Sequence, residues 1–353
     1  MKKSSILGAG LVSLVLVLAG CSSSSSDSTA AAPADSAAAA PSVTFESSES
    51  SLPVGYDEPA AGKFKVAYMN PVGGNEFLDT MGKAMKMATE KLGGTYIEVD
   101  GKGSVDTQVS QLEQLTAQKV DGIFVFALDP NSMKPALAKA KAAGIKLISI
   151  DENFTGDDIG SYDSQIMQRR GEAAFLGAQQ MAKLVGAGAS VGTMDFKIAV
   201  PSIVYSIEQA KKWATAFGLK VAGNASNPSD DIAGGESAGT ELLNNNPDIK
   251  GVIAYNDPSA VGASSAAKSA NKTGLFFGGQ NGGSDGLAAV ASGKINYTIQ
   301  LAAPSIGKFA AWGLYNLKQG KTIPKTVRGD APVLVTTETA SSAKSWADIL
   351  ASM

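Results

Sequence analysis

The chain has 353 residues, of which 18 % are charged and 44 % apolar, a composition typical of a globular protein with room for two domains. Its formal net charge of −3 argues against nucleic acid as a partner. It contains no histidine and one cysteine, which excludes histidine-based acid–base catalysis, a disulfide framework and cysteine-based zinc sites. We therefore expect neither a metal nor an organic cofactor.

The N-terminus has the pattern of an export signal. Lys2 and Lys3 precede an apolar run from Ile6 to Leu18, which is shorter than a membrane-spanning helix. The run ends in Leu18-Ala19-Gly20-Cys21, which resembles the lipobox of bacterial lipoproteins. The resemblance implies removal of residues 1–20, a lipid on Cys21, and an extracytoplasmic protein anchored to the cell membrane. The alternative is an ordinary signal peptide with a chance cysteine.

Residues 21–62 read as a tether. They contain a serine run at 22–26, followed by a stretch rich in alanine, proline and serine that extends to Ser42. Such a composition cannot bury a core, so we predict a disordered segment that joins the lipidated cysteine to the globular body.

The first half of the body alternates short apolar runs with segments of helical periodicity. Gly93-Gly94 and Gly144 end two of these helices, and Asn75 is a good N-cap for the first. In chain order the predicted elements are strand Phe64–Met69, helix 75–92, strand Thr95–Val99, helix Val105–Leu115, strand Gly122–Ala127, helix Pro135–Ala143, strand Lys146–Ile150 and a long helix Ile166–Val185.

The same alternation then begins again. In chain order we predict strand Ser190–Asp195, helix Ser206–Phe217, strand Leu219–Ala222, helix Glu236–Asn244, strand Val252–Tyr255, a helix from Pro258, strand Leu275–Phe277, helix Asp285–Ser292, strand Tyr297–Gln300, helix Pro304–Leu317, strand Val333–Thr336 and an amphipathic tail Ser341–Met353. Strands alternating with helices indicate parallel, doubly wound α/β sheets. Because the pattern occurs twice, we predict two similar lobes with a ligand cleft where the strands end.

Several short motifs together resemble the type 1 periplasmic binding proteins of ABC importers, specifically the ribose-binding-like group. They are Asn75-Glu76-Phe77, Ile148-Ser149-Ile150-Asp151, Asn246-Pro247-Asp248-Ile249, Ala254-Tyr255-Asn256-Asp257, Gly279-Gln280-Asn281-Gly282 and Thr298-Ile299-Gln300. The resemblance implies a hinge of three chain crossings, which we place near Tyr162, Gln300 and Ala331. The N-terminal lobe is then 63–162 and 301–331, the C-terminal lobe 163–300 and 332–340, and 341–353 a C-terminal tail.

The family's ligand contacts, carried over to matching strand ends, identify a set of candidate residues. Asparagine and aspartate can hold pairs of hydroxyl groups, and an aromatic face can cover the C–H side of a sugar. For Asn75, Asp151, Asn256 and Asp257 the structural alternative is capping, and for Phe77 it is core packing. The candidates are Asn75, Phe77, Asp151, Glu152, Asn153, Tyr205, Asp231, Asn256, Asp257, Asn281 and Gln300. Asp230, beside Asp231, could reach the cleft as well; for both the alternative is a solvated loop residue.

The sequence departs from the family pattern in its arginines. Pentose and hexose binders of the family usually have arginine after the Asp at the end of strand four, and a second arginine after the first strand of the second lobe. Here Glu152 follows Asp151, and residues 196–206 contain no arginine. We therefore expect an acidic or neutral, rather apolar site that suits a linear polyol or a small deoxy sugar, with an amine-bearing solute as the alternative.

The resemblance implies a monomeric binding protein that captures a small polyhydroxylated solute and delivers it to an ABC permease with its ATPase. A ligand-presenting sensor with the same fold is the alternative. An enzyme is disfavoured, because the chain has no histidine to activate a nucleophile and no Walker A loop.

Overall fold

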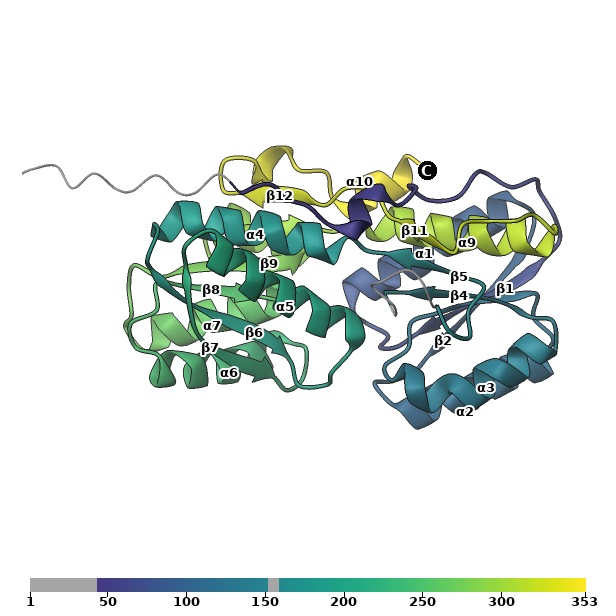
Figure 1. Cartoon of the computed structure of the whole chain (residues 1–353), viewed down its shortest axis with the longest axis horizontal. Helices are drawn as coiled ribbons and strands as arrows, with labels where there is room; N and C mark the ends of the chain where they lie inside the picture. Colours follow the sequence, from purple (N-terminus) through teal and green to yellow (C-terminus); the bar gives the residue numbers. More distant parts are fainter. Residues whose placement is uncertain (1–42, 152–158) are drawn as a thin grey trace, which may run out of the picture. The chain divides into compact units, whose positions relative to one another are not determined.

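Residues 43–151 and 159–353 are described by a computed structural model, in which two six-stranded sheets each carry helices on both faces (Figure 1). The signal peptide, Cys21, Glu152 and Asn153 lie outside the described residues. In the first sheet the order is β11 (Thr326–Arg328), β5 (Ser164–Met167), β4 (Lys146–Ile150), β3 (Gly122–Val125), β1 (Lys65–Asn70) and β2 (Thr95–Asp100), and all the pairs are parallel.

The second sheet repeats this arrangement with one reversed edge strand. Its order is β12 (Val333–Thr336), β10 (Tyr297–Gln300), β9 (Phe276–Asn281), β8 (Gly251–Ala254), β6 (Ser190–Phe196) and β7 (Lys220–Asn227), and only β12 runs antiparallel to its neighbour. Two similar doubly wound lobes are therefore present, as the alternating pattern predicts. Strand β8 is a short run without polar side chains, Gly-Val-Ile-Ala, and is buried along its whole length because helices cover both faces of the sheet.

Helices pack in pairs on the faces of the sheets. In the first lobe α1 (Glu76–Lys91) pairs with α9 (Ala303–Lys318), and α2 (Val105–Ala117) pairs with α3 (Pro130–Ala142) on the opposite face (Figure 1). In the second lobe α4 (Arg170–Val185) pairs with α5 (Pro201–Ala216), and α6 (Ile232–Asn245) with α7 (Asp257–Ser269); α8 (Ser284–Ala291) lies near the edge. Gly262 allows α7 to approach α6, since a Cβ there would lie 2.4 Å from the Glu236 amide.

The predicted helix Ile166–Val185 is wrong at its start. Residues Ser164–Met167 are all buried and form β5, which pairs with β4 on one side and β11 on the other. The helix α4 begins only at Arg170, after Arg169 adopts a left-handed backbone with φ of 58°. Ile166 and Met167 fit the apolar pattern of the helix that follows them, so the sequence predicts them as its first residues. The short strand β11 is absent from the predicted elements.

The chain passes between the lobes at the ends of these elements. The passages lie at residues 168–169 between β5 and α4, at 301–302 between β10 and α9, and at 329–332 between β11 and β12. We had placed them near Tyr162, Gln300 and Ala331. The C-terminal tail makes one more passage: α10 (Trp346–Ala351) contacts α9 of the first lobe, and the indole of Trp346 donates to the Leu301 carbonyl at 2.9 Å.

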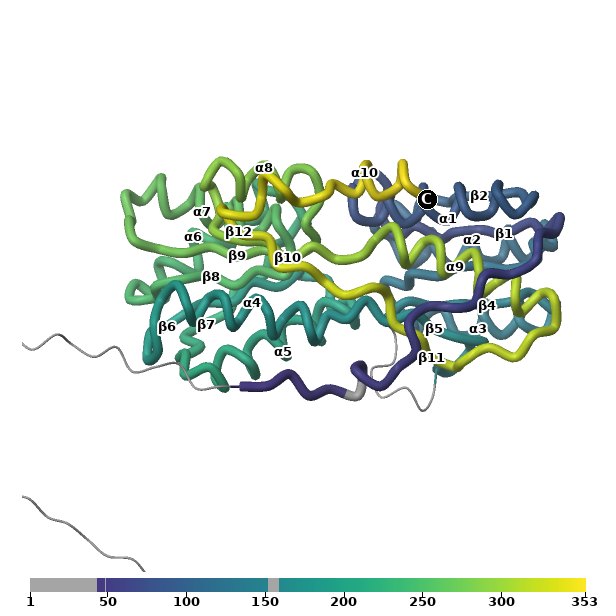
Figure 2. The backbone as a smooth tube through the Cα atoms, turned by 90° about the horizontal axis from the view of Figure 1, so that it is seen from above, coloured from purple at the N-terminus to yellow at the C-terminus, as the bar shows by residue number. Residues whose placement is uncertain are grey.

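The prediction that the disordered tether extends to residue 62 is wrong for its last part. Residues 43–60, here called the N-terminal strap, pack along both lobes (Figure 2, purple). Phe45 lies 5.5 Å from the Phe175 ring, and the Tyr56 hydroxyl is 2.8 Å from Ser164 Oγ. The few aromatic residues of this segment find partners on the body, which local composition does not reveal. None of the helices in residues 43–151 and 159–353 is long and apolar enough to cross a membrane.

Candidate functional site

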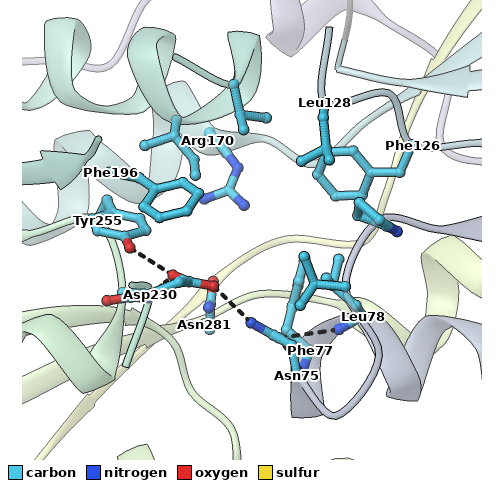
Figure 3. Close-up of a pocket in the computed structure, with 15 residues that line it drawn as sticks. Asn75, Phe77, Leu78, Phe126, Leu128, Arg170, Phe196, Asp230, Tyr255 and Asn281 are labelled. Atoms are coloured by element: carbon cyan, nitrogen blue, oxygen red, sulfur yellow. Dashed lines mark hydrogen bonds between the residues drawn. The ribbon is translucent and has the colours of Figure 1, made fainter. Parts of the chain in front are cut away.

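A pocket of about 520 Å³ lies where the strands of the two sheets end (Figure 3). Every lining residue lies at or after the carboxyl end of a strand, the usual place for ligands in parallel sheets. The first lobe contributes Pro71, Val72, Asn75, Phe77, Leu78, Phe126 and Leu128. The second contributes Arg170, Phe196, Val200, Ile203, Asp230, Tyr255, Asn256 and Asn281.

Asp230 is the centre of the polar part of the pocket. Its Oδ1 accepts hydrogen bonds from the Tyr255 hydroxyl at 2.6 Å and from Asn256 Nδ2 at 2.7 Å. Its Oδ2 accepts from Asn75 Nδ2 of the first lobe at 3.1 Å (Figure 3). Burial raises the pKa of Asp230, and these hydrogen bonds act in the opposite direction. The carboxylate therefore joins both lobes at the pocket floor.

The neighbouring residue Asp231, which we predicted as a ligand contact, has another role. Its Oδ1 accepts from the Gly234 amide at 2.7 Å and caps α6. The left-handed backbone of Asp230, with φ of 61°, turns that side chain to the pocket wall while Asp231 stays at the exposed mouth of the cleft. Two adjacent aspartates are thus separated by one backbone angle, which the sequence does not show.

Asn75 and Asn256 combine the two roles that the sequence left as alternatives. In each case Oδ1 caps a helix, accepting from Phe77 N at 3.1 Å and from Ser259 N at 2.9 Å respectively. In each case Nδ2 donates to Asp230. The cap fixes the orientation of the amide, so that its NH₂ group faces the pocket without loss of side-chain freedom on binding.

Aromatic and aliphatic side chains form the remaining walls. Phe77, at the start of α1, and Phe126, after β3, face the pocket from the first lobe. Phe196 faces it from the second and stacks on Tyr255, with 6.1 Å between ring centroids. These flat surfaces suit the C–H face of a ring or chain whose hydroxyl groups turn toward Asp230.

Arg170 is the one charged lining residue that the sequence analysis does not name, and it overturns the expectation of a site without arginine. It is 5 % exposed, and its guanidinium extends from α4 toward the pocket (Figure 3). Its carbon Cζ lies 5.8 Å from the Phe77 ring centre. Among the described residues Nη1 has no hydrogen-bond partner. The available signal was Arg169-Arg170 directly after a buried strand, but that strand was hidden in the predicted helix.

Asp151 lies behind Arg170 rather than in the pocket wall. Its Oδ2 is 3.7 Å from Arg170 Nε, and its Oδ1 accepts from the Gln168 amide at 2.7 Å. Burial raises the pKa of Asp151 to about 7, and Arg170 opposes that shift. The prediction placed Asp151 against the ligand; the structure places it against the arginine that faces the ligand site.

The other predicted contacts divide clearly. Asn281 lines the pocket, with φ of 99° and a buried Oδ1 that has no partner among the described residues. Asp257 accepts from Thr298 and Gly282 inside the second lobe. Gln300 donates to the Gly282 and Lys344 carbonyls, both at 3.0 Å. Tyr205 donates to Glu49 of the strap at 2.8 Å. These last three do not line the pocket.

Asp257 is a buried carboxylate without a cationic partner in the part of the chain that is described. Burial raises its pKa to about 7, while the hydrogen bonds from Thr298 and Gly282 act against the shift. Within the same described ranges no group of three or more acidic or cysteine side chains is arranged to hold a metal ion.

Comparison with known proteins identifies the architecture. Residues 66–322 match the family described as "Periplasmic binding protein domain". A ribose import binding protein of Bacillus subtilis (strain 168) is 26 % identical over 265 residues, which cover 75 % of this chain and 84 % of that protein. A xylitol-binding protein of Mycolicibacterium smegmatis is 28 % identical over 262 residues, covering 65 % of each.

Solved structures show the same fold. A solute-binding protein of Burkholderia graminis in complex with D-arabinose superposes with a TM-score of 0.73 at 23 % identity and covers 80 % of this chain and 99 % of that one. One from Bacillus halodurans with bound myo-inositol has a TM-score of 0.70 at 22 % identity, covering 82 % and 99 %.

Proposed function

The chain belongs to the periplasmic binding protein domain family, and on this premise we propose that it is an extracytoplasmic solute-binding protein of an ABC importer. Its ligand is a neutral monosaccharide or polyol held between the lobes. The observation that supports this ligand class is the composition of the pocket: Asp230, Asn256 and Asn75 form one hydrogen-bonded group that faces aromatic surfaces. The relatives that are named for a ligand bind sugars or polyols.

Arg170 favours a neutral ligand over an amine. The expectation of a cation site depended on a pocket with carboxylates and no arginine. A guanidinium beside the ligand position repels an ammonium group, whereas it can donate to hydroxyl or ring oxygens of a sugar. Linear polyols and ring sugars both meet this requirement.

Ligand binding acts through closure of the cleft. Asn75 and Asp230 belong to different lobes and already meet at the pocket floor. A ligand that bonds to both lobes favours the state in which they are close, and it shifts the equilibrium only by contacts that the separated lobes lack. Micromolar binding corresponds to roughly −8 kcal/mol. The closed form is then the one that the permease accepts.

The lipobox-like sequence before Cys21 supports the cellular placement in this proposal. A lipid on that cysteine keeps the binding lobes near the membrane that holds the permease. Cells are grown with a labelled fatty acid, and the label bound to the purified protein is measured. We expect label on the unmodified chain and none on a Cys21→Ala variant, which tests this part separately from ligand binding.

The ligand assignment is tested by titration calorimetry of the purified chain with D-ribose, D-arabinose, D-allose, xylitol, myo-inositol and, as a cationic competitor class, putrescine. We expect micromolar binding of at least one sugar or polyol, and loss of that binding in Asp230→Ala. Binding of putrescine alone would show that the ligand is an amine, and it would overturn the role assigned to Arg170.

A further inference from the structure

The N-terminal strap carries the one buried carboxylate of the described residues 43–60. It begins on the second lobe, where Phe45 packs against Phe175 and Trp213 at 5.5 and 5.8 Å. A short 3-10 helix, η1 (Ser48–Ser51), follows, and it places Glu49 in the interior with 2 % exposure. By contrast Glu46, three residues earlier, is exposed.

After η1 the strap is bound to the first lobe. Gly55 donates to the Arg328 carbonyl at 2.9 Å, and Arg328 donates to the Pro53 carbonyl at 2.8 Å, so the strap extends the edge strand β11. Farther along, Asn316 of α9 donates to the Asp57 carbonyl at 2.7 Å. The strap is therefore attached to both lobes, and Glu49 lies in the stretch between its two attachments (Figure 2).

Glu49 lies against the first turn of the helix that bears the pocket arginine. The N-cap position of α4 is Arg169, which makes no side-chain capping bond. The Glu49 carboxylate accepts from the Tyr205 hydroxyl of α5 at 2.8 Å and approaches Gly171 in the first turn of α4. Gly171 allows this approach, since a Cβ there would lie 2.9 Å from Glu49 Oε1. A carboxylate at a helix N-terminus also interacts favourably with the helix dipole.

Arg170 is the first residue of that turn. Its side chain makes one ion pair in the described chain, with Asp151 at a long 3.7 Å, so its position depends strongly on where the helix begins. The chain has only three arginines among its 30 basic residues, and all three lie at or next to passages between the lobes: Arg169 and Arg170 follow β5, and Arg328 is the last residue of β11. The planar guanidinium groups with their several donors are thus all found in this region.

We propose that Glu49 is a positioning residue of the ligand site: with its carboxylate packed against the first turn of α4 it holds Arg170 at the pocket wall, so that the segment leading to the N-terminus contributes to ligand affinity. This proposal rests on the proposed function only for its affinity measurement. The position of Arg170 is a property of the protein without ligand and can be measured by itself.

The first experiment makes use of the small number of arginines in the chain, which keeps the spectrum of labelled arginine side chains simple. Labelling the full chain with ¹⁵N-arginine gives three Nε–Hε signals, and Arg170→Lys identifies the one that belongs to Arg170. We expect Glu49→Ala to shift or broaden that signal, and Glu46→Ala, a matched change at an exposed glutamate of the same strap, to leave it in place. An unchanged Arg170 signal in folded Glu49→Ala overturns the proposal whether or not any sugar binds.

The second experiment measures affinity by calorimetry with whichever of D-ribose, D-arabinose, D-allose, xylitol and myo-inositol binds the unmodified chain. We expect about tenfold weaker binding in Glu49→Ala and a change of at most about twofold in Glu46→Ala. Glu49→Gln should retain most of the affinity, because its amide oxygen can accept the same hydrogen bond from Tyr205 and fills the same space. A lower melting temperature with unchanged affinity would show that Glu49 is only structural.

If Glu49→Ala does not fold, Tyr205→Phe serves in its place, because it removes one donor to Glu49 and little volume. We then expect a smaller shift of the same Arg170 signal and about threefold weaker binding. If none of the five probes binds the unmodified chain, the proposed ligand class fails, while the arginine signal still decides the role of Glu49.

Discussion

The two lobes have the same topology but supply opposite chemistry to the pocket. Of the lining residues from the first lobe only Asn75 is polar; the others are apolar, with Phe77 and Phe126 the largest. The second lobe provides a carboxylate, a guanidinium, a phenol and two carboxamides. The first lobe thus offers a mainly apolar contact surface, and the second offers hydrogen-bonding groups of fixed direction. A ligand with one apolar face and one hydroxylated face has a single preferred orientation between such walls.

This difference between the lining residues also explains how two lobes of similar fold make unequal contributions to the pocket. Strand ends place side chains at the same edge in both sheets, but the residue at each end is free to vary. The helix caps Asn75 and Asn256, one in each lobe, contribute their second polar group to the pocket. Apolar packing in the first lobe needs no such precision, because hydrophobic contact is not directional.

The largest test of this contrast is Asp230→Ala. Removing the acceptor of three hydrogen bonds leaves Tyr255, Asn256 and Asn75 without their common partner, and we expect at least 100-fold weaker sugar or polyol binding by calorimetry. The matched change Asp231→Ala removes only the cap of α6. It should leave affinity within about twofold and cost about 1 kcal/mol of stability in urea unfolding. Equal losses of affinity in both variants would contradict the assignment.

The apolar wall is tested by Phe77→Leu. The change keeps a hydrophobic side chain but removes the flat face, so we expect about tenfold weaker binding, chiefly through faster dissociation in stopped-flow measurements. Phe64→Leu is the control, because Phe64 packs edge-on against Tyr315 at 4.9 Å away from the pocket lining. If binding is unaffected by the change at Phe77, the ligand contacts only the second lobe.

Contact between the lobes outside the pocket gives a smaller effect. Both carboxylate oxygens of Glu76 in the first lobe accept from the Ser284 amide, at 2.8 and 3.0 Å, and so cap α8 of the second lobe. The N-cap of that helix, Gly283, has no side chain to do so. Glu76→Ala should lower ligand affinity about threefold and increase the radius of gyration of the ligand-free protein in X-ray scattering. Glu90→Ala, on the exposed part of α1, should do neither.

The smallest predicted effect concerns the pH dependence of stability, and it comes from Asp257, a polar residue buried inside the second lobe. The pKa of Asp257 is raised to about 7 in the folded state, against 3.8 as its ordinary value. The folded protein therefore holds this proton more tightly than the unfolded chain, and its stability decreases as pH rises from about 4 to 7. The slope from one such group is at most about 1.4 kcal/mol per pH unit.

Asp257→Asn removes this titration, so the stability measured by urea unfolding between pH 4.5 and pH 7 should change less steeply. Asp151, whose pKa is also raised to about 7 by burial, contributes a slope of the same sign that remains in the variant. Asp285→Asn on exposed α8 is the control and should keep the original slope. A slope that is the same in all three proteins would mean that Asp257 does not carry the effect.

The sequence by itself determined the architecture and part of the site. Alternation of short apolar runs with helical periodicity is a local signal, and it predicts two doubly wound lobes because each strand and helix is specified by its own residues. The prediction that Asn75, Phe77, Asn256 and Asn281 line a cleft followed from strand ends and family motifs, and the structure places all four in the pocket wall.

Only the tertiary structure decided the rest, and the reasons are physical. Whether Asp230 or Asp231 faces the pocket depends on one left-handed residue, and whether Ser164–Met167 is strand or helix depends on its two neighbours in the sheet. The first turn of α4 and Glu49 are far apart in the chain and come together because the strap lies across the start of that helix. Contacts between distant segments leave no periodicity in the sequence, so they appear only when the chain is folded.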